Sequence, residues 1–119
     1  MPDRNAVLIV DDDPSMLRSL KRLLRQQGFE PVVFESAAGL RAHAGFERAR
    51  CMVLDINLRD GSGIVLQREL AAAGITLPVV YITGNDDEAT RHSAMTSGCL
   101  AYLVKPFAAK SLIAAINKS

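Results

Sequence analysis

The sequence predicts an α/β fold in which a parallel sheet carries helices on both faces. Short apolar runs take turns with amphipathic segments along the whole chain, which indicates strands joined by helices. Within each run the apolar residues are continuous, as is typical of strands buried on both faces. Glycines follow the amphipathic segments at Gly28, Gly74 and Gly98, where helices commonly end.

Length and composition indicate one globular domain spanning residues 1–119. Hydrophobic residues make up 49% of the chain and charged residues 23%, and the net charge of +1 argues against a strongly basic nucleic-acid surface. No apolar run approaches the roughly 18–20 residues that cross a membrane. Cys51 and Cys99 lack a metal-binding spacing, so two free thiols in a cytoplasmic protein are expected.

The first strand is predicted at Ala6–Val10, and three aspartates follow it directly. Asp13 and Pro14 form a helix start, because an acid caps the free N–H groups and proline is tolerated at the first helical position. The helix continues to Gly28. Its apolar face holds Met16, Leu17, Leu20, Leu23 and Leu24, and a basic face holds Arg18, Lys21, Arg22 and Arg25.

Two further strand and helix pairs follow. The second strand, Pro31–Phe34, leads to a weak helix that Ser36 caps and that extends to about His43. The third strand, Cys51–Asp55, ends in a carboxylate, and its helix is expected from Ile64 to about Ala73.

The last two pairs complete the alternation. A strand at Leu77–Ile82 precedes a helix from about Asp87 to Ser97, and a strand at Leu100–Val104 precedes a helix from Ala108 to about Asn117. The helix that begins near Asp87 is the least apolar. Its best core candidates are Ala89, Ala94 and Met95.

Strict alternation implies right-handed crossovers and a three-layer (βα)5 sandwich. The expected strand order is 2-1-3-4-5, the flavodoxin-like order. Four of the five strands then end at one rim of the sheet in a reactive group; these are Asp11 with Asp12, Asp55, Thr83 and Lys105. Since neighbouring strands lie about 4.8 Å apart, the three carboxylates are expected to converge.

Three neighbouring carboxylates repel one another and need positive charge. Lys105 has a side chain long enough to reach Asp55. Hard oxygen ligands also suit Mg²⁺, which keeps waters and accepts phosphate oxygens. With the Thr83 hydroxyl, these groups are the components of a phosphoryl-transfer site whose nucleophile is a carboxylate.

This arrangement resembles the CheY-like receiver domain of two-component response regulators over essentially the whole chain. The matching residues are Val10-Asp11-Asp12-Asp13-Pro14, Asp55 with Leu58 and Gly61-Ser62-Gly63, Thr83-Gly84, and Lys105-Pro106-Phe107. The segments Ile82-Thr83-Gly84 and Lys105-Pro106-Phe107 look most like receivers of transcriptional regulators related to FixJ.

The resemblance implies that Asp55 accepts a phosphoryl group from a sensor histidine kinase or a histidine phosphotransfer protein. It implies Mg²⁺ as cofactor, with Mn²⁺ as a substitute. Asp12 and Asp55 would bind the metal directly, Asp11 largely through a water, and Asn57 through its backbone carbonyl. Lys105 would pair with Asp55 and then with the phosphoryl oxygens.

The resemblance also implies a conformational switch. On phosphorylation, the Thr83 side chain would move inward toward the phosphoryl oxygen, and Tyr102 would turn inward into the space that Thr83 leaves. The output surface would be the face of the fourth helix, fifth strand and fifth helix, through which phosphorylation-dependent homodimers form. The Lys105–Pro106 bond is expected to be cis. The chain would assist its own phosphorylation and dephosphorylation without being an ordinary enzyme.

One departure from the family pattern is Arg59, which stands where receivers often have proline and should alter the stiffness of that loop.

Other functions stay open. A receiver linked to a DNA-binding output domain, a stand-alone receiver acting by protein contact and a pseudo-receiver share the fold. A Mg²⁺-dependent aspartyl phosphatase of the haloacid dehalogenase type needs acids after its lysine, and no Asp or Glu follows Lys105. A flavin-binding module of the same fold would need a Ser/Thr/Gly-rich phosphate loop after the first strand, where Asp11, Asp12 and Asp13 would repel a phosphate in the absence of a metal.

Overall fold

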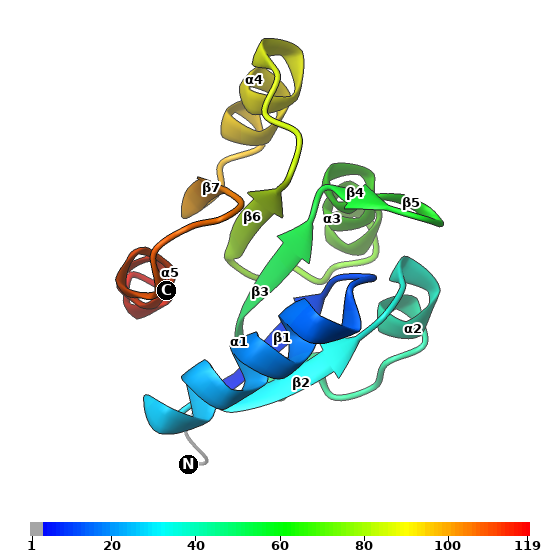
Figure 1. Cartoon of the computed structure of the whole chain (residues 1–119). Coiled ribbons are helices and arrows are strands. Elements are labelled where there is room, and N and C mark those ends of the chain that lie inside the picture. Colours follow the sequence, from blue (N-terminus) through cyan, green and yellow to red (C-terminus); the bar gives the residue numbers. More distant parts are fainter. Residues whose placement is uncertain (1–3) are drawn as a thin grey trace.

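The computed structural model describes residues 4–119, and its centre is a parallel sheet of five strands in the order β2-β1-β3-β6-β7 (Figure 1). Counted within this sheet, the order is 2-1-3-4-5, so the predicted flavodoxin-like topology is confirmed. The strands are β1 (Ala6–Val10), β2 (Glu30–Phe34), β3 (Ala49–Asp55), β6 (Val79–Thr83) and β7 (Ala101–Val104).

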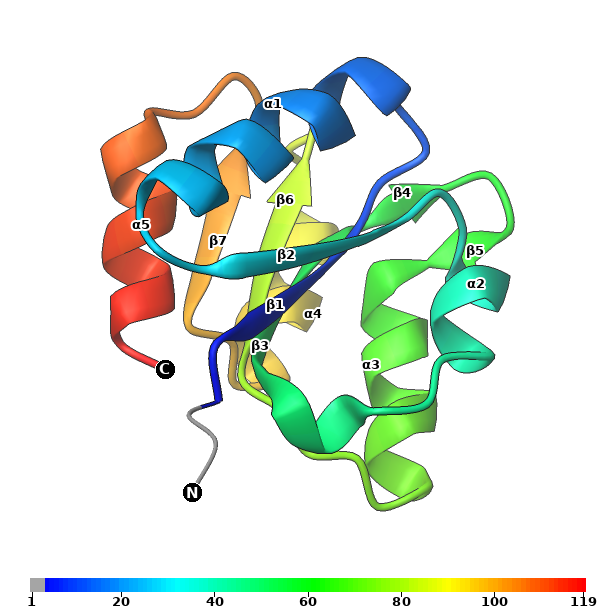
Figure 2. The same ribbon diagram turned by 90° about the horizontal axis from the view of Figure 1, so that it is seen from below.

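Helices cover both faces of the sheet, as Figure 2 shows in a view from below. Helices α1 and α5 lie on one face, and α2, α3 and α4 lie on the other. Their bounds are α1 (Pro14–Gln26), α2 (Ala37–Arg41), α3 (Gly63–Ala72), α4 (Glu88–Thr96) and α5 (Ala109–Asn117), with a 3-10 turn, η1, at Phe46–Arg48. No helix within residues 4–119 is both long and apolar enough to cross a membrane.

Each face of the sheet has its own hydrophobic core, because successive strand residues point to opposite sides. In β1, Val7 and Ile9 pack towards α1 and α5, whereas Leu8 and Val10 pack towards α2 and α3. Burying such a side chain contributes about 1.5–3 kcal/mol. Two hydrophobic cores therefore hold the strands of the sheet in place.

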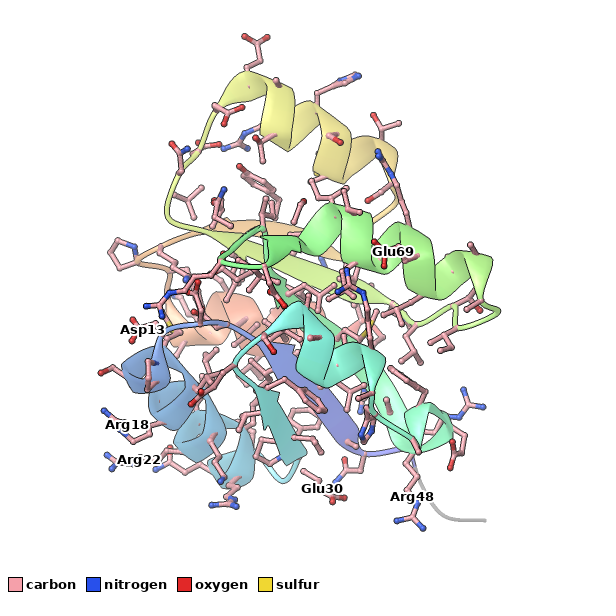
Figure 3. The ribbon with its side chains drawn as sticks, turned by 90° about the vertical axis from the view of Figure 1, so that its right-hand side faces the viewer. Asp13, Arg18, Arg22, Glu30, Arg48 and Glu69 are labelled. Atoms are coloured by element: carbon pink, nitrogen blue, oxygen red, sulfur yellow. The ribbon has the colours of Figure 1, made fainter. Side chains whose placement is uncertain are left out.

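The first helix forms as predicted. Asp13 caps α1 by accepting a hydrogen bond from the Ser15 amide at 2.9 Å, and Pro14 occupies the first turn. Its basic side chains Arg18 and Arg22 point away from the sheet (Figure 3). The helix capped by Ser36 is shorter than predicted and ends at Arg41. The next segment leaves the helix, and the His43 ring packs edge-on between Phe34 and Phe46 at 5.2 Å from each.

The expected core of α4 is only partly correct. Ala94 is fully buried, but Ala89 is exposed and Met95 is 57% exposed, so the predictions of Ala89 and Met95 as core residues are wrong. Ala94 is the one fully buried residue of α4, because the remaining residues of this helix are largely polar. Among the α-helices within residues 4–119, α4 contributes the fewest buried residues to the core.

A small antiparallel hairpin after β3 was not predicted. It pairs β4 (Asn57–Leu58) with β5 (Gly61–Ser62) around a turn at Arg59 and Asp60. Gly61 allows the turn because its φ is +146°, which side-chain-bearing residues rarely adopt.

Asp60 ties this hairpin to α2. Its carboxylate accepts hydrogen bonds from the amides of Ala37 and Ala38, both at 3.0 Å, and these amides hold the pKa of Asp60 below its usual value. The loop that follows Asp55 is therefore held at its tip by the first turn of α2.

Gly63 packs closely against the backbone of Asp55. Its amide donates to the Ile56 carbonyl at 3.1 Å, and a Cβ at this position would overlap the carbonyl oxygen of Asp55. We expect Gly63→Ala to lower the free energy of unfolding by about 1–3 kcal/mol in urea titrations. Gly84→Ala is the matched control, because a Cβ there meets open space. Equal stability of the two variants would contradict this prediction.

Candidate functional site

Reactive side chains meet where four strands end. Val10 pairs with Leu54 and Asp55 with Ile82, so Asp11 and Asp55 lie at neighbouring levels at the carboxyl edge of β1 and β3. Thr83 ends β6 beside Val104, and Lys105 follows β7. Asp11, Asp55 and Thr83 are the buried polar and charged residues of the described chain. The predicted rim is thus assembled by the register of the sheet.

Lys105 links two of the carboxylates. Its Nζ donates to Asp11 Oδ2 at 2.7 Å and to Asp55 Oδ2 at 3.0 Å. One carboxylate oxygen from each of Asp11, Asp12 and Asp55 lies within 4.8 Å of the others. The ammonium therefore offsets part of the repulsion among three close negative charges.

Backbone amides orient the carboxylates. Asp55 Oδ1 accepts from the Asn57 amide at 3.0 Å, and Asp11 Oδ1 accepts from the Asp13 amide at 2.9 Å. Both oxygens of Asp11 therefore already accept hydrogen bonds. Asp12 is the most exposed of the three acids, at 24% of its side chain, and its Oδ2 accepts from the Arg59 amide at 3.1 Å.

Burial sets the acid–base character of the site. Burial raises the pKa of Asp55, although hydrogen bonds from Lys105 and the Asn57 amide oppose this and the Asp11 charge adds to it. Burial alone would lower the pKa of Lys105, but its bonds to Asp11 and Asp55 outweigh burial and the pKa is raised. Lys105 consequently stays protonated at neutral pH.

The donor set fits a hard divalent cation. Three carboxylates converge, and Asp12 reaches solvent, so waters could complete the coordination of Mg²⁺. Within residues 4–119 both oxygens of Asp11 and both oxygens of Asp55 already accept hydrogen bonds, so the solvent-reaching Asp12 is the acid best placed to bind a cation directly.

The Thr83 hydroxyl is fully engaged. It donates to Asn57 Oδ1 at 2.8 Å, accepts from the Asn85 amide at 3.0 Å, and lies 3.2 Å from the Asn85 carbonyl. It thereby connects the loop after β3 with the loop after β6. The Asn57 side chain is part of this link, a contact that its sequence position did not reveal.

Tyr102 lies on β7, outside the carboxylate cluster. Its side chain is half-buried, and its hydroxyl donates to Asp86 at 3.0 Å. The Lys105–Pro106 bond is cis, as predicted. Cys51 is buried and Cys99 half-buried, and both are free thiols.

The roles of Asp60 and Asp86 near the site went unnoticed in the sequence, and Arg59 was noted only for its effect on the stiffness of its loop. Asp60 and the Arg59 amide position the loop after Asp55, and Asp86 contacts Tyr102. From the sequence, Asp86 was interpreted only as an acid at the start of a helix. Asp60 caps a helix more than 20 residues earlier in the chain, so no local pattern marks it.

Comparisons with known proteins agree with this geometry. The family model described as response regulator receiver domain matches residues 7–117. Nodulation protein W of Bradyrhizobium diazoefficiens is 39% identical over 92% of this chain and 48% of its own length. The transcriptional regulatory protein FixJ of Azorhizobium caulinodans is 35% identical over 100% of this chain and 56% of its own length.

Solved structures show the same similarity. The crystal structure of FixJ-N has a TM-score of 0.85 and 33% identity, and the match covers 99% of this chain and 94% of that one. A receiver domain protein from Clostridium thermocellum has a TM-score of 0.86 and 30% identity, with 95% and 91% covered. The chain spans about half the length of the curated relatives it matches.

Proposed function

Since this chain belongs to the family of response regulator receiver domains, we propose that it is the phosphoryl acceptor of a cytoplasmic two-component phosphorelay. The acceptor is Asp55, and residues 1–119 form one receiver domain. The observation that carries this proposal is the buried Asp55 carboxylate, which is held by Lys105 and the Asn57 amide beside two further acids.

Phosphoryl transfer would use Asp55 as the nucleophile. A carboxylate oxygen of Asp55 forms a bond to phosphorus, and the bond from phosphorus to the histidine nitrogen of a kinase or phosphotransfer protein breaks, leaving its electron pair on that nitrogen. The product is an aspartyl phosphate. Lys105 remains charged and offsets negative charge on the phosphoryl oxygens, and the Asn57 amide keeps the carboxylate oriented.

The metal-binding role is assigned to Asp12 and Asp55 directly, to Asp11 through water, and to the Asn57 carbonyl. A bound Mg²⁺ would supply positive charge to the phosphoryl oxygens and orient them. The solvent-reaching Asp12 carboxylate supports this assignment.

The switch and the output are also proposals. Thr83 would exchange its bond to Asn57 for one to the phosphoryl group, and Tyr102 would respond on the face formed by α4, β7 and α5. This face would form a homodimer or contact a further domain. Because FixJ is named as a transcriptional regulatory protein, the proposed output is control of transcription, with DNA bound outside residues 1–119.

Acetyl phosphate with Mg²⁺ tests the proposal. Intact-mass spectrometry should show one phosphoryl adduct, stable in acid and labile in base, and Asp55→Asn should show none. An adduct that persists in Asp55→Asn would overturn the assignment of Asp55. Continuous release of phosphate from phosphate esters would favour the phosphatase alternative, and no adduct at all would favour a pseudo-receiver.

A further inference from the structure

Tyr102 is held from two sides by charged residues of one loop and one helix. Its hydroxyl donates to Asp86 Oδ1 at 3.0 Å, and the Arg91 guanidinium lies over its ring at 4.9 Å from the centroid. Arg91 Nη2 also donates to Asp86 Oδ2 at 2.8 Å. The three side chains therefore form a closed set of mutual contacts, here called the Tyr102 clamp.

The pKa values reflect the same contacts. Hydrogen bonds from Arg91 and then Tyr102 hold the pKa of Asp86 below its usual value. Burial and the bond to Asp86 raise the pKa of Tyr102 to about 12. Asp86 is thus ionised and Tyr102 protonated throughout the neutral range, and the clamp persists there.

The clamp is joined to the phosphoryl site through the backbone after β6. Thr83 accepts a hydrogen bond from the Asn85 amide at 3.0 Å, and Asp86 is the next residue. Asp87 then caps α4 by accepting from the Thr90 amide at 2.7 Å. A shift of the Thr83 hydroxyl away from Asn57 would therefore disturb its hydrogen bond to the segment that carries the Asp86 carboxylate.

The weak anchoring of α4 makes the clamp important. Ala94 is the one fully buried side chain that this helix contributes. Arg91 lies in the N-terminal half of α4, so its contacts with Asp86 and Tyr102 fasten that half to β7.

We infer that Asp86 and Arg91 are positioning residues that hold Tyr102 in the arrangement in which Thr83 is bonded to Asn57, and so weaken binding of the phosphoryl group at Asp55. This inference rests on the proposed function. A phosphoryl group that recruits Thr83 must work against the clamp. Removing the clamp should leave more of the protein ready to bind, which tightens the apparent affinity.

The test measures binding of beryllofluoride, a phosphoryl mimic, in the presence of Mg²⁺. Titrations of the full chain are followed by the ring carbon resonances of Tyr102, which Tyr102→Phe assigns. Asp86→Ala and Arg91→Ala should each tighten the dissociation constant about two- to fivefold. Before any beryllofluoride is added, the Tyr102 resonance of Asp86→Ala and of Arg91→Ala should already lie closer to the bound position than that of the unmodified chain does.

The pair of variants separates the clamp from simple electrostatics. Asp86→Ala removes a negative charge and Arg91→Ala a positive one, so a through-space charge effect would change affinity in opposite directions. The clamp predicts the same direction for both. Glu88→Ala and Lys110→Ala serve as controls, because they remove exposed charges from α4 and α5 without touching Tyr102, and they should leave the affinity unchanged.

Each outcome bears on one proposal. Unchanged or weaker binding in both clamp variants, or opposite shifts, would overturn the clamp while leaving the receiver function intact. Failure of the unmodified chain to bind beryllofluoride would instead contradict the proposed function. A loss of thermal stability without a change in affinity would show that the contacts are merely structural, and would also overturn the inference.

Discussion

Replacing Lys105 with Met is expected to lower the free energy of unfolding by about 3–5 kcal/mol at neutral pH, the loss typical when one partner of a buried ion pair is removed. Methionine keeps much of the length of the side chain but removes the ammonium that contacts Asp11 and Asp55. Both carboxylates are then left buried without their cation. Urea unfolding at pH 7 without Mg²⁺ measures the loss.

The pH dependence identifies the cause. The pKa of Lys105 is raised in the folded chain, so its stabilising contribution is present at all pH values below the ordinary lysine range and is lost only as pH rises above it. In the variant, acid protonates the carboxylates, so its deficit should shrink below about pH 5. Replacing the exposed Lys110 of α5 with Met should cause no deficit. A deficit independent of pH would point to lost packing instead.

Asp55→Asn is expected to abolish phosphoryl acceptance and yet stabilise the fold by on the order of 1 kcal/mol at neutral pH. The amide can keep the hydrogen bond from Asn57 while removing one of three close negative charges. Lys105 retains its bond to Asp11. Functional sites commonly carry such a cost in stability.

The sign of this effect follows from the pKa of Asp55. Burial raises it above the ordinary 3.8, so the folded chain binds the proton more tightly than the unfolded chain. The stability of the unmodified protein therefore falls as pH rises through the window between the ordinary pKa of 3.8 and the raised pKa of the folded chain, and it stays lower above that window. Unfolding midpoints should favour Asp55→Asn at pH 7 and converge below the window, whereas Glu88→Gln should change neither. A variant less stable at pH 7 would contradict the argument.

Much of the fold could be predicted because its signals are local. The continuous apolar runs marked the strands, the Asp13-Pro14 and Ser36 caps marked two helix starts, and alternation implied the strand order. The errors also have local causes. Met95 and Ala89 are apolar, but the polar residues around them keep α4 on the surface, so both remain exposed.

The candidate site could be predicted as a set of residues but not as a set of contacts. Strand ends in a parallel sheet share one rim, which is why the acids, Thr83 and Lys105 were recognised from order and spacing. That Lys105 bonds Asp11 as closely as Asp55, and that Thr83 is tied to Asn57, depends on side-chain rotamers in a packed rim.

The sequence by itself determined the topology and which residues meet at the rim, because hydrophobic periodicity and residue type act within a few neighbouring positions. Only the tertiary structure decided that Asp60 holds the loop after Asp55 from the start of α2, and that Asp86 and Arg91 enclose Tyr102. These contacts join segments brought together by the packing of separate elements. Their polar side chains are also stable when they are exposed to water, so no pattern in the sequence requires them to pair.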